Sequence, residues 1–168
     1  MSYVKVNNRA LILNQLKEER KSRKDIADKI KLTPAAVTIL VNELMQEGCI
    51  VESSHVDTSG NVGRKKIFVK LNKEFRYTIG VNIEPKLVSV GIANLASEII
   101  KSEKFKINSR MSVDEIIKKI VKACMDLLWE LNISKSNVLG IGVGIVGIVD
   151  SSKGISNHAY GLWKEQVN

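Results

Sequence analysis

Two groups of basic side chains in the first half of the chain are placed as they would be on a surface that binds a polyanion. Arg23 and Lys24 open an expected short helix, and Arg64 and Lys65 follow a polar loop that ends in Gly63. Guanidinium and ammonium groups bind DNA phosphates, and such contacts position a protein and make its affinity depend on salt. Arg64 could also enter an AT-rich minor groove. These residues predict contacts with DNA, although charges of this kind can also serve solubility alone.

Small and polar side chains between the two basic groups suit the reading of bases. An amide such as Asn42 can pair with adenine, and alanine and threonine methyl groups can meet the methyl group of thymine. Because residues 33–42 contain no Lys or Arg, direct readout of guanine is not expected. The predicted contacts in this segment are Thr33, Pro34, Ala35, Ala36, Thr38 and Asn42. The alternative is a helix face that is merely solvated.

Helix-start signals on both sides of a tight turn predict how these side chains are presented. Ser22 and Asp25 have the spacing of a capping box at the start of a short helix. Thr33 is the expected N-cap of the next helix, with Pro34 at its first position, where a missing N–H is no loss. That helix is expected to run to about Glu47. Two helices joined in this way are typical of a helix-turn-helix, and an ordinary helical hairpin is the alternative.

The flanking segments complete a winged helix-turn-helix. An amphipathic helix is expected over residues 7–19, before the capping box. Apolar strands are expected at 49–52 and 67–71, and the polar segment between them has turn-forming residues at its centre. These two strands and their basic loop would form the wing.

A polar connector at residues 72–76 predicts a boundary between a domain at 1–74 and a second domain at 75–168. The second domain is expected to hold strands at 77–83, 87–94 and 98–107, a helix at 113–131 that a second capping box opens, and a buried strand at 138–149. The order βββαβ predicts an α/β half-domain with a mixed sheet.

The segment from Asn157 to Trp163 has a polar or aromatic group at most positions. Aromatic faces combined with amide and imidazole groups suit the binding of a sugar. The candidate sugar ligands are Asn157, His158, Tyr160 and Trp163. An ordinary packed loop is the alternative interpretation.

Three glycines, Gly142, Gly144 and Gly147, match the dinucleotide pattern G-x-G-x-x-G. The match lies inside an expected strand, and a turn follows it where the pattern requires the N-terminus of a helix for the pyrophosphate. We therefore reject a dinucleotide site and expect the glycines to allow close packing in the sheet.

Composition favours a soluble cytoplasmic protein. The 168 residues carry a formal net charge of +8, and residues 1–74 hold 14 Lys and Arg against 9 Asp and Glu. The two cysteines and two histidines lack metal-ligand spacing, so no metal site is predicted. The longest apolar run, residues 138–149, is too short to span a membrane.

The order of these motifs resembles that of the ROK transcriptional regulators, repressors related to bacterial sugar kinases. Residues 33–44 with Gly63 and Arg64 are similar to the DNA-binding domain of that family, and residues 80–84 and 140–150 are similar to its G-[VI]-D-[IL]-G element and its G-I-G-[IV]-x-x-P-G-x-[VI]-D strand. The resemblance implies an α+β winged helix-turn-helix followed by an α/β actin-like (ribonuclease H-like) half-domain, βββαβ.

Several positions depart from the family pattern. Asn82, Glu84 and Pro85 replace the acid and glycines of the kinase phosphate loop, and Glu84 would place a negative charge where phosphate should sit. ATP binding and phosphoryl transfer are therefore not expected, and no enzyme activity, catalytic residue or cofactor is predicted. Val146 stands at a proline position, and Ile39 stands where many members have an arginine on the recognition helix.

The resemblance also implies that a complete member continues for roughly another domain. That part would hold the catalytic aspartate of the kinases, further sugar ligands, a zinc cluster and much of the dimer surface. We therefore expect a fragment, a truncated product or a natural DNA-binding half. Its last sheet would be incompletely covered, with apolar surface and an unpaired strand edge.

These features predict a sequence-specific DNA-binding regulator, a repressor of sugar-utilisation genes that responds to a sugar or sugar phosphate. The partners expected are double-stranded operator DNA, bound as a homodimer on a pseudo-palindrome, and a sugar effector; no membrane partner is expected. A sugar-kinase-like enzyme fragment and a module that modulates a full-length relative are the alternatives. The operator and the effector are not specified by the sequence.

Overall fold

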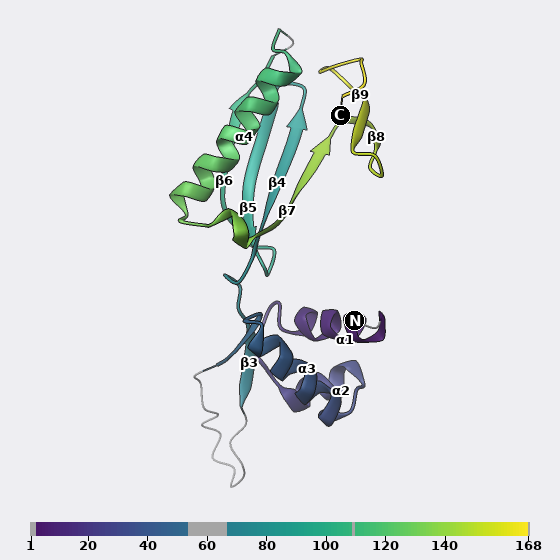
Figure 1. The fold of residues 1–168 in the computed structure, drawn as a ribbon, viewed down its shortest axis with the longest axis vertical. Coiled ribbons are helices and arrows are strands. Elements are labelled where there is room, and N and C mark those ends of the chain that lie inside the picture. Colours follow the sequence, from purple (N-terminus) through teal and green to yellow (C-terminus); the bar gives the residue numbers. More distant parts are fainter. Residues whose placement is uncertain (1–2, 54–66, 109, 168) are drawn as a thin grey trace. The chain divides into compact units, whose positions relative to one another are not determined.

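A computed structural model describes residues 3–53, 67–108 and 110–167, which belong to two compact units, Met1–Phe75 and Arg76–Asn168 (Figure 1). The boundary between the units lies one residue beyond the 74/75 boundary expected from the sequence. In the part of the chain that the structure describes, no helix combines the length and apolar character that a membrane span requires.

Three helices build the first unit: α1 (Tyr3–Gln15), α2 (Arg23–Ile30) and α3 (Pro34–Gln46). The expectation for α1 was wrong by four residues at each end. The helix ends early because the chain turns at Leu16, which buries that side chain and leaves the charged residues after it outside the helix. The buried face of α1 is centred on Ile12.

Local hydrogen bonds start α2 and α3 where the sequence predicts. Ser22 is the N-cap of α2; its hydroxyl accepts the backbone N–H of Asp25 at 3.2 Å, and the carboxylate of Asp25 accepts the backbone N–H of Ser22 at 3.2 Å. Thr33 caps α3 by accepting the N–H of Ala36 at 3.3 Å, with Pro34 at the first helical position. Both caps satisfy N–H groups that a helix start leaves without partners.

The sheet of the first unit has three strands in the order β1-β3-β2. The strands β2 (Ile50–Glu52) and β3 (Phe68–Leu71) pair antiparallel as the wing requires. A short strand that the sequence did not indicate, β1 (Lys21–Ser22), pairs with the other edge of β3 and so ties the start of α2 to the wing strands. The wing loop, including Arg64 and Lys65, lies outside the described residues.

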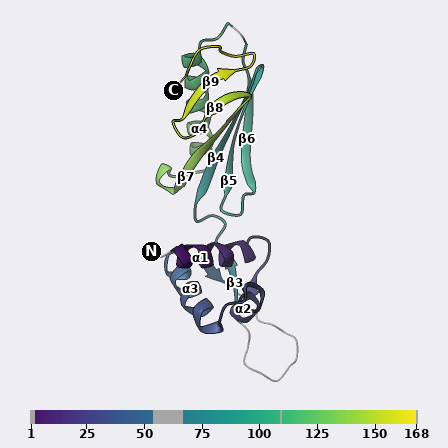
Figure 2. The same cartoon turned by 90° about the vertical axis from the view of Figure 1, so that its right-hand side faces the viewer.

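The second unit contains a four-stranded mixed sheet in the order β6-β5-β4-β7 (Figure 2). Its strands are β4 (Tyr77–Glu84), β5 (Leu87–Asn94), β6 (Ile99–Lys106) and β7 (Val138–Ile145). The first three form an antiparallel meander, and β7 lies parallel to β4. The predicted order βββαβ and the mixed sheet are therefore confirmed.

One long helix, α4 (Val113–Glu130), lies across one face of this sheet (Figure 1). The second predicted capping box is present, with Ser112 as the N-cap and Glu115 as its partner. Alternate residues of β4 and β5 are buried, and the core that they form with the helix includes Ile79, Val81, Val88, Val90, Ile116 and Leu127.

The apolar segment expected as one strand at 138–149 is two strands in two sheets. The first, β7, is an edge of the large sheet, and β8 (Gly147–Asp150) pairs with β9 (Ile155–Ala159) in a separate hairpin. At the start of β8 the backbones of the two strands of this hairpin lie very close together. A Cβ built on Gly147 would be only 2.0 Å from the carbonyl oxygen of His158. Only glycine allows this approach.

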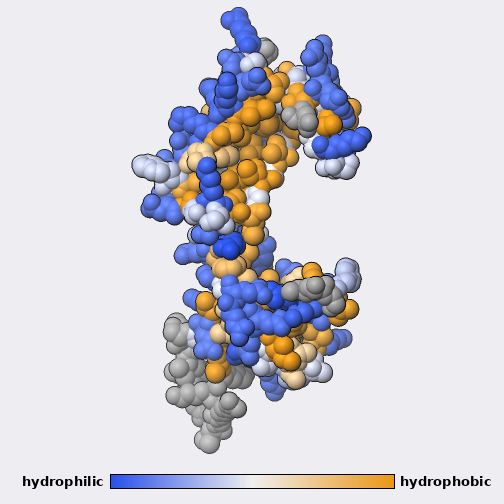
Figure 3. Space-filling model, in the orientation of Figure 1, coloured by the Kyte–Doolittle hydropathy of each residue, from blue (hydrophilic) through white to orange (hydrophobic). Residues whose placement is uncertain are grey.

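The expectation that this segment is buried was also wrong. Leu139, Ile141 and Val143 of β7 are 61%, 59% and 60% exposed, because α4 packs on β5 and β6 and leaves the edge strand uncovered. Apolar side chains gather between α4 and β7 (Figure 3) around a groove of about 900 Å³. Of the three glycines expected to allow close packing, Gly142 does not, because a Cβ there would meet no described atom within 4 Å. Gly144 does, because a Cβ there would lie 3.3 Å from the side-chain oxygen of Asn82, and Gly147 allows the close approach in the hairpin.

The capping box of α2 gives a test of what positions this helix. We expect Asp25→Ala to lower the free energy of unfolding of the first unit by about 1 kcal/mol, because it removes the acceptor of the Ser22 N–H at a helix start. Asp28→Ala, on the exposed face of the same helix, should change it by less than about 0.5 kcal/mol. Urea unfolding followed by far-UV circular dichroism measures both, and equal effects would contradict the capping role.

The capping box of α4 makes the second unit sensitive to pH. Hydrogen bonds from the backbone N–H and the hydroxyl of Ser112 hold the pKa of Glu115 below its usual value. A pKa lowered by folding stabilises the folded state above the ordinary carboxyl range, and that stabilisation is lost as pH falls through the folded pKa.

We therefore expect Glu115→Gln to lower the melting temperature of the second unit at neutral pH, with a difference from the wild type that shrinks on acidification. Both tryptophans, Trp129 and Trp163, lie in the second unit, so tryptophan fluorescence follows its unfolding. Glu165→Gln, at an exposed carboxylate, is the control. A difference that is independent of pH would show that the charge of Glu115 does not contribute.

Candidate nucleic-acid interface

The outer face of α3 is the surface that the first unit presents for base contacts. Val37, Leu40, Val41 and Leu44 are buried on its inner face. The side chains exposed on the outer face are Ala35, Thr38, Ile39 and Asn42. Their spacing of i, i+3, i+4 and i+7 places them together on one side of the helix, and α3 contains no Lys or Arg.

Ile39 belongs to this face but was absent from the predicted contacts. It is 60% exposed, although it is a large apolar side chain in the middle of a helix. A helical projection could have found it, because Ile39 falls outside the apolar stripe that contains Val37 and Leu44. Ala36, which was predicted to contact DNA, is half-buried, and Pro34 is exposed at the start of the helix.

The two threonine hydroxyls near this face bond to the backbone of α3. The Thr33 hydroxyl oxygen accepts the N–H of Ala36 at 3.3 Å. The Thr38 hydroxyl donates to the carbonyl oxygen of Pro34 at 2.8 Å, a bond from one helical turn to the previous one. The hydroxyl of Thr38 therefore turns along the helix, and its methyl group is left for contact with other molecules.

Arg23 and Asn42, both predicted to contact DNA, are bonded to each other. The guanidinium of Arg23 donates to the side-chain oxygen of Asn42 at 3.2 Å and lies 3.9 Å from a carboxylate oxygen of Glu52. It also approaches the sulfur of Met45 at 3.6 Å. Arg23 thus connects the first turn of α2 to α3 and β2, and most of its side chain is buried.

The other basic side chains near α3 differ in whether they are exposed or already in contact with another side chain. Lys24, Lys29 and Lys31 are exposed. Lys21 forms an ion pair with Glu19 at 2.6 Å, and the guanidinium of Arg20 lies 5.4 Å from the centre of the Phe68 ring. Of the predicted pair Arg23 and Lys24, it is therefore Lys24 that is open to a phosphate.

Ionic contacts that the sequence did not indicate join α1 to the end of α3. Arg9 hydrogen-bonds to Glu47 and lies 3.5 Å from Glu43, which also pairs with Lys5 at 2.7 Å. The hydrogen bond from Arg9 lowers the pKa of Glu47. Because such pairs join residues more than thirty positions apart, no local pattern in the sequence reveals them.

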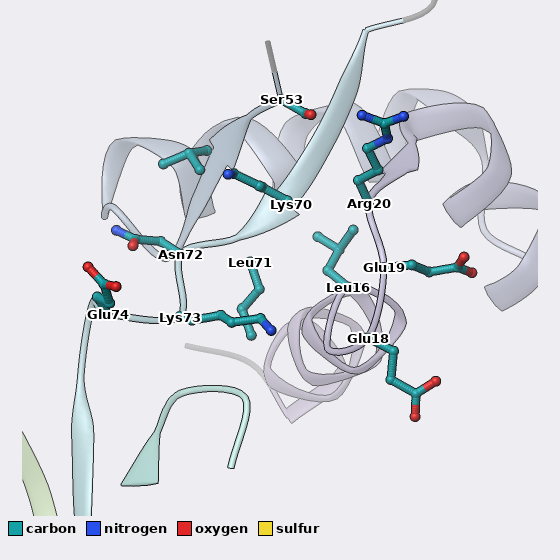
Figure 4. Close-up of a pocket in the computed structure, with 11 residues that line it drawn as sticks. Leu16, Glu18, Glu19, Arg20, Ser53, Lys70, Leu71, Asn72, Lys73 and Glu74 are labelled. Carbon is teal, nitrogen blue, oxygen red and sulfur yellow. The ribbon is translucent and has the colours of Figure 1, made fainter. Parts of the chain in front are cut away.

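A pocket of about 550 Å³ lies in the first unit beside the wing strands (Figure 4). Leu16 and Leu71 are among the apolar residues that line it. Its charged residues have both signs: Glu18, Glu19 and Glu74 against Arg20, Lys70 and Lys73. This mixture does not favour an anion such as DNA, so the pocket is not part of the candidate interface.

The four candidate sugar ligands lie in β9 and the turn after it, but they do not all meet. The rings of His158 and Tyr160 contact edge to face, with centroids 4.8 Å apart. Trp163 lines the groove beside α4 and donates its indole N–H to the hydroxyl of Ser156 at 3.1 Å. Asn157 accepts a hydrogen bond from Gln166 at 3.2 Å. His158 and Tyr160 are the pair that the fold brings together.

The end of β4 carries Asn82 and Glu84, two of the residues that depart from the kinase pattern in the sequence. There the carboxylate of Glu84 accepts a hydrogen bond from the amide of Asn82 at 3.0 Å. The end of β4 thus presents a carboxylate, which repels a phosphate group. Among residues 3–53, 67–108 and 110–167, moreover, no three His, Cys, Asp or Glu side chains are grouped so that they could hold a metal ion.

The first unit is similar to a known class of DNA-binding domains. Residues 8–51 match the family model described as winged helix-turn-helix DNA-binding. This match spans most of α1, all of α2 and α3, and the start of β2.

Several curated proteins are similar over most of the chain. The xylose repressor of Caldicellulosiruptor bescii is 28% identical over 88% of this chain and 37% of its own length, and that of Bacillus subtilis is 24% identical over 96% of this chain and 41% of its own. The DNA-binding transcriptional dual regulator NagC of Escherichia coli is 23% identical over 79% of this chain and 32% of its own length. The chain thus spans about two-fifths of the length of these relatives or less.

A solved structure shares the fold. It is described as that of the ROK family transcriptional regulator, homolog of E.coli MLC protein, and it matches with a TM-score of 0.70 and 17% identity over 98% of this chain and 41% of its own. The arrangement of a winged helix followed by a mixed sheet with one long helix is therefore found in this regulator as well.

The contacts of Arg23 lead to a prediction for the first unit. We expect Arg23→Met, which keeps the apolar part of the side chain, to lower the free energy of unfolding by about 1 kcal/mol, because the bonds to Asn42 and Glu52 are removed. Lys24→Met, at the exposed neighbouring position, should change it by less than about 0.5 kcal/mol. Urea unfolding followed by circular dichroism distinguishes the two. If both substitutions had the same effect, the contacts of Arg23 with Asn42 and Glu52 would not stabilise the first unit.

Proposed function

We propose that the chain is a ROK-family transcriptional regulator that binds a specific DNA operator, as its winged helix-turn-helix match and its similarity to several repressors support. The observation that carries the proposal is the outer face of α3, which is uncharged, exposed and free of bulky polar groups. A helix of this kind fits the major groove, where base edges are read. Lys24 beside it, and Arg64 and Lys65 in the wing sequence, would contact phosphates.

We further propose that the regulated genes serve sugar utilisation and that the regulator is a repressor. The names of several similar proteins support this, because they are xylose repressors and an N-acetylglucosamine repressor. A sugar or sugar phosphate would be the effector, and Asn157, His158, Tyr160 and Trp163 are the candidate ligands. The adjoining rings of His158 and Tyr160 support this choice, because aromatic and imidazole groups together suit a sugar.

Two copies of the chain would bind a pseudo-palindromic operator. One winged helix contacts only a short half-site, and a two-fold symmetric dimer contacts two such half-sites. An effector would change the affinity for DNA only if it bound the two forms of the protein with different strength.

The test is selection of binding sites from random duplex DNA with the full chain, followed by fluorescence anisotropy on the selected and scrambled duplexes across a salt series. We expect a preference of at least about a hundredfold, well within the range of specific DNA-binding proteins, and an affinity that falls steeply with salt. Equal weak binding to both duplexes would mean that the basic surface alone attracts DNA, and the proposal would be wrong.

Two substitutions distinguish contacts with the DNA phosphates, which position the protein, from contacts with the bases, which give sequence preference. Lys24→Gln should weaken binding to selected and scrambled duplexes alike and reduce the salt slope by about one phosphate contact, whereas Asn42→Ala should reduce the preference for the selected duplex. Lys164→Gln, at an exposed lysine of the second unit, is the control for charge and should leave binding to both duplexes unchanged.

A further inference from the structure

We propose that α3 reads thymine through its 5-methyl group: Ala35, Thr38 and Ile39 form a surface of methyl groups that packs against thymine methyls in the major groove. The inference rests on the proposed function, since it assumes that α3 enters the groove. It limits the base contacts suggested by the sequence to thymine and adds Ile39 to the side chains that make them.

The exposed face of α3 is apolar at its centre. Ala35, Thr38 and Ile39 occupy adjacent positions on the outer side of the helix, and Ile39 is largely exposed there. The buried stripe on the opposite side fixes this orientation. Methyl and methylene groups therefore make up the centre of the surface that α3 offers to DNA.

The hydroxyl of Thr38 is already bonded within the helix. It donates to the carbonyl oxygen of Pro34 at 2.8 Å, which holds the side chain with its oxygen toward the helix backbone. Because its hydroxyl hydrogen is already used within the helix, Thr38 can contact a base through its methyl group and not as a hydrogen-bond donor. The hydroxyl oxygen of Thr33 is likewise engaged in the cap of α3.

Asn42 is the polar residue at the edge of this surface. Its side-chain oxygen accepts a hydrogen bond from Arg23, so its NH2 group is the part that points away from that partner. An amide that pairs with adenine in the bidentate manner must offer both its oxygen and its NH2. In this arrangement Asn42 supplies a donor, which suits an acceptor on a base or a phosphate.

The major groove contains one apolar group that matches such a surface. Guanine, cytosine and adenine display donors and acceptors there, while thymine also displays a methyl group. A methyl surface placed against polar base edges would leave donors and acceptors without partners, which is unfavourable. Placed against thymine methyls, it buries apolar area on both sides. The geometry of α3 therefore selects thymine.

Thymine can be changed without changing the protein. In the duplex obtained by binding-site selection, thymines opposite α3 are replaced by deoxyuridine, which lacks only the methyl group, or by 5-bromodeoxyuridine, which carries a bromine of similar size. Removal of each contacted methyl group should weaken binding about fourfold, so replacement of three such thymines should weaken it by more than about tenfold. The bromine should restore most of the affinity, and scrambled DNA should show no change.

Matched variants of one residue separate the methyl group from the hydroxyl. Thr38→Val keeps a methyl in place and removes the hydroxyl, whereas Thr38→Ser does the reverse. We expect Thr38→Val to bind the selected duplex as the wild type does, and Thr38→Ser to bind it about fourfold more weakly. Full affinity of Thr38→Ser together with weakened binding by Thr38→Val would overturn the proposal, because the hydroxyl would then be the reading group.

A coupling experiment tests Ile39 itself. Ile39→Ala should bind the thymine duplex more weakly and should distinguish it less strongly from the deoxyuridine duplex, because one of the three methyl-bearing side chains is shortened. Folding is not at risk, since Ile39 is exposed and alanine favours a helix. Val6→Ala, at an exposed valine of α1, is the control and should keep the full discrimination.

The outcomes distinguish this inference from the proposed function. Strong preference for the selected duplex together with equal affinity for thymine and deoxyuridine would overturn the reading by methyl groups while leaving the DNA-binding function intact. No preference for any selected duplex would overturn both. Weaker binding with deoxyuridine, recovery with 5-bromodeoxyuridine and reduced discrimination in Ile39→Ala would together support the inference.

Discussion

The burial of one apolar stripe of α3 determines what the first unit can do. Val37, Leu40, Val41 and Leu44 pack inward, and burying side chains of this size is the main favourable contribution to holding a small unit together. Because a helix is rigid, fixing one face also fixes the other. The orientation of Ala35, Thr38 and Ile39 toward the outside is therefore a consequence of the core rather than a separate feature.

Connections between elements then limit which polar groups remain for a ligand. Arg23 bonds to Asn42 and approaches Glu52, and Arg9 holds the carboxylate of Glu47, so these two arginines serve the arrangement of α1, α2, α3 and β2. Such bonds keep α3 in one position relative to the wing strands. A surface that is held in place loses less entropy on binding than one that must first be ordered.

In the second unit, too, the packing of one helix determines which side chains are buried and which are exposed. The core between α4 and the strands β4 and β5 is well buried, yet the edge strand β7 is left with its apolar side chains exposed. One helix is too narrow to cover a sheet of this width, since a helix is about 10 Å across and neighbouring strands lie about 5 Å apart. The groove beside β7 is the part of the sheet that α4 does not cover.

What the sequence determined by itself was local: both capping boxes, the cap and proline at the start of α3, the positions of the strands β4 to β6 and the order βββαβ. These features depend on residues close together in the chain, so their patterns can be read directly. The tertiary structure alone decided that Arg23 bonds to Asn42 and that residues 138–149 divide between two sheets. Each of these depends on which distant segments come into contact, and neither periodicity nor composition records that.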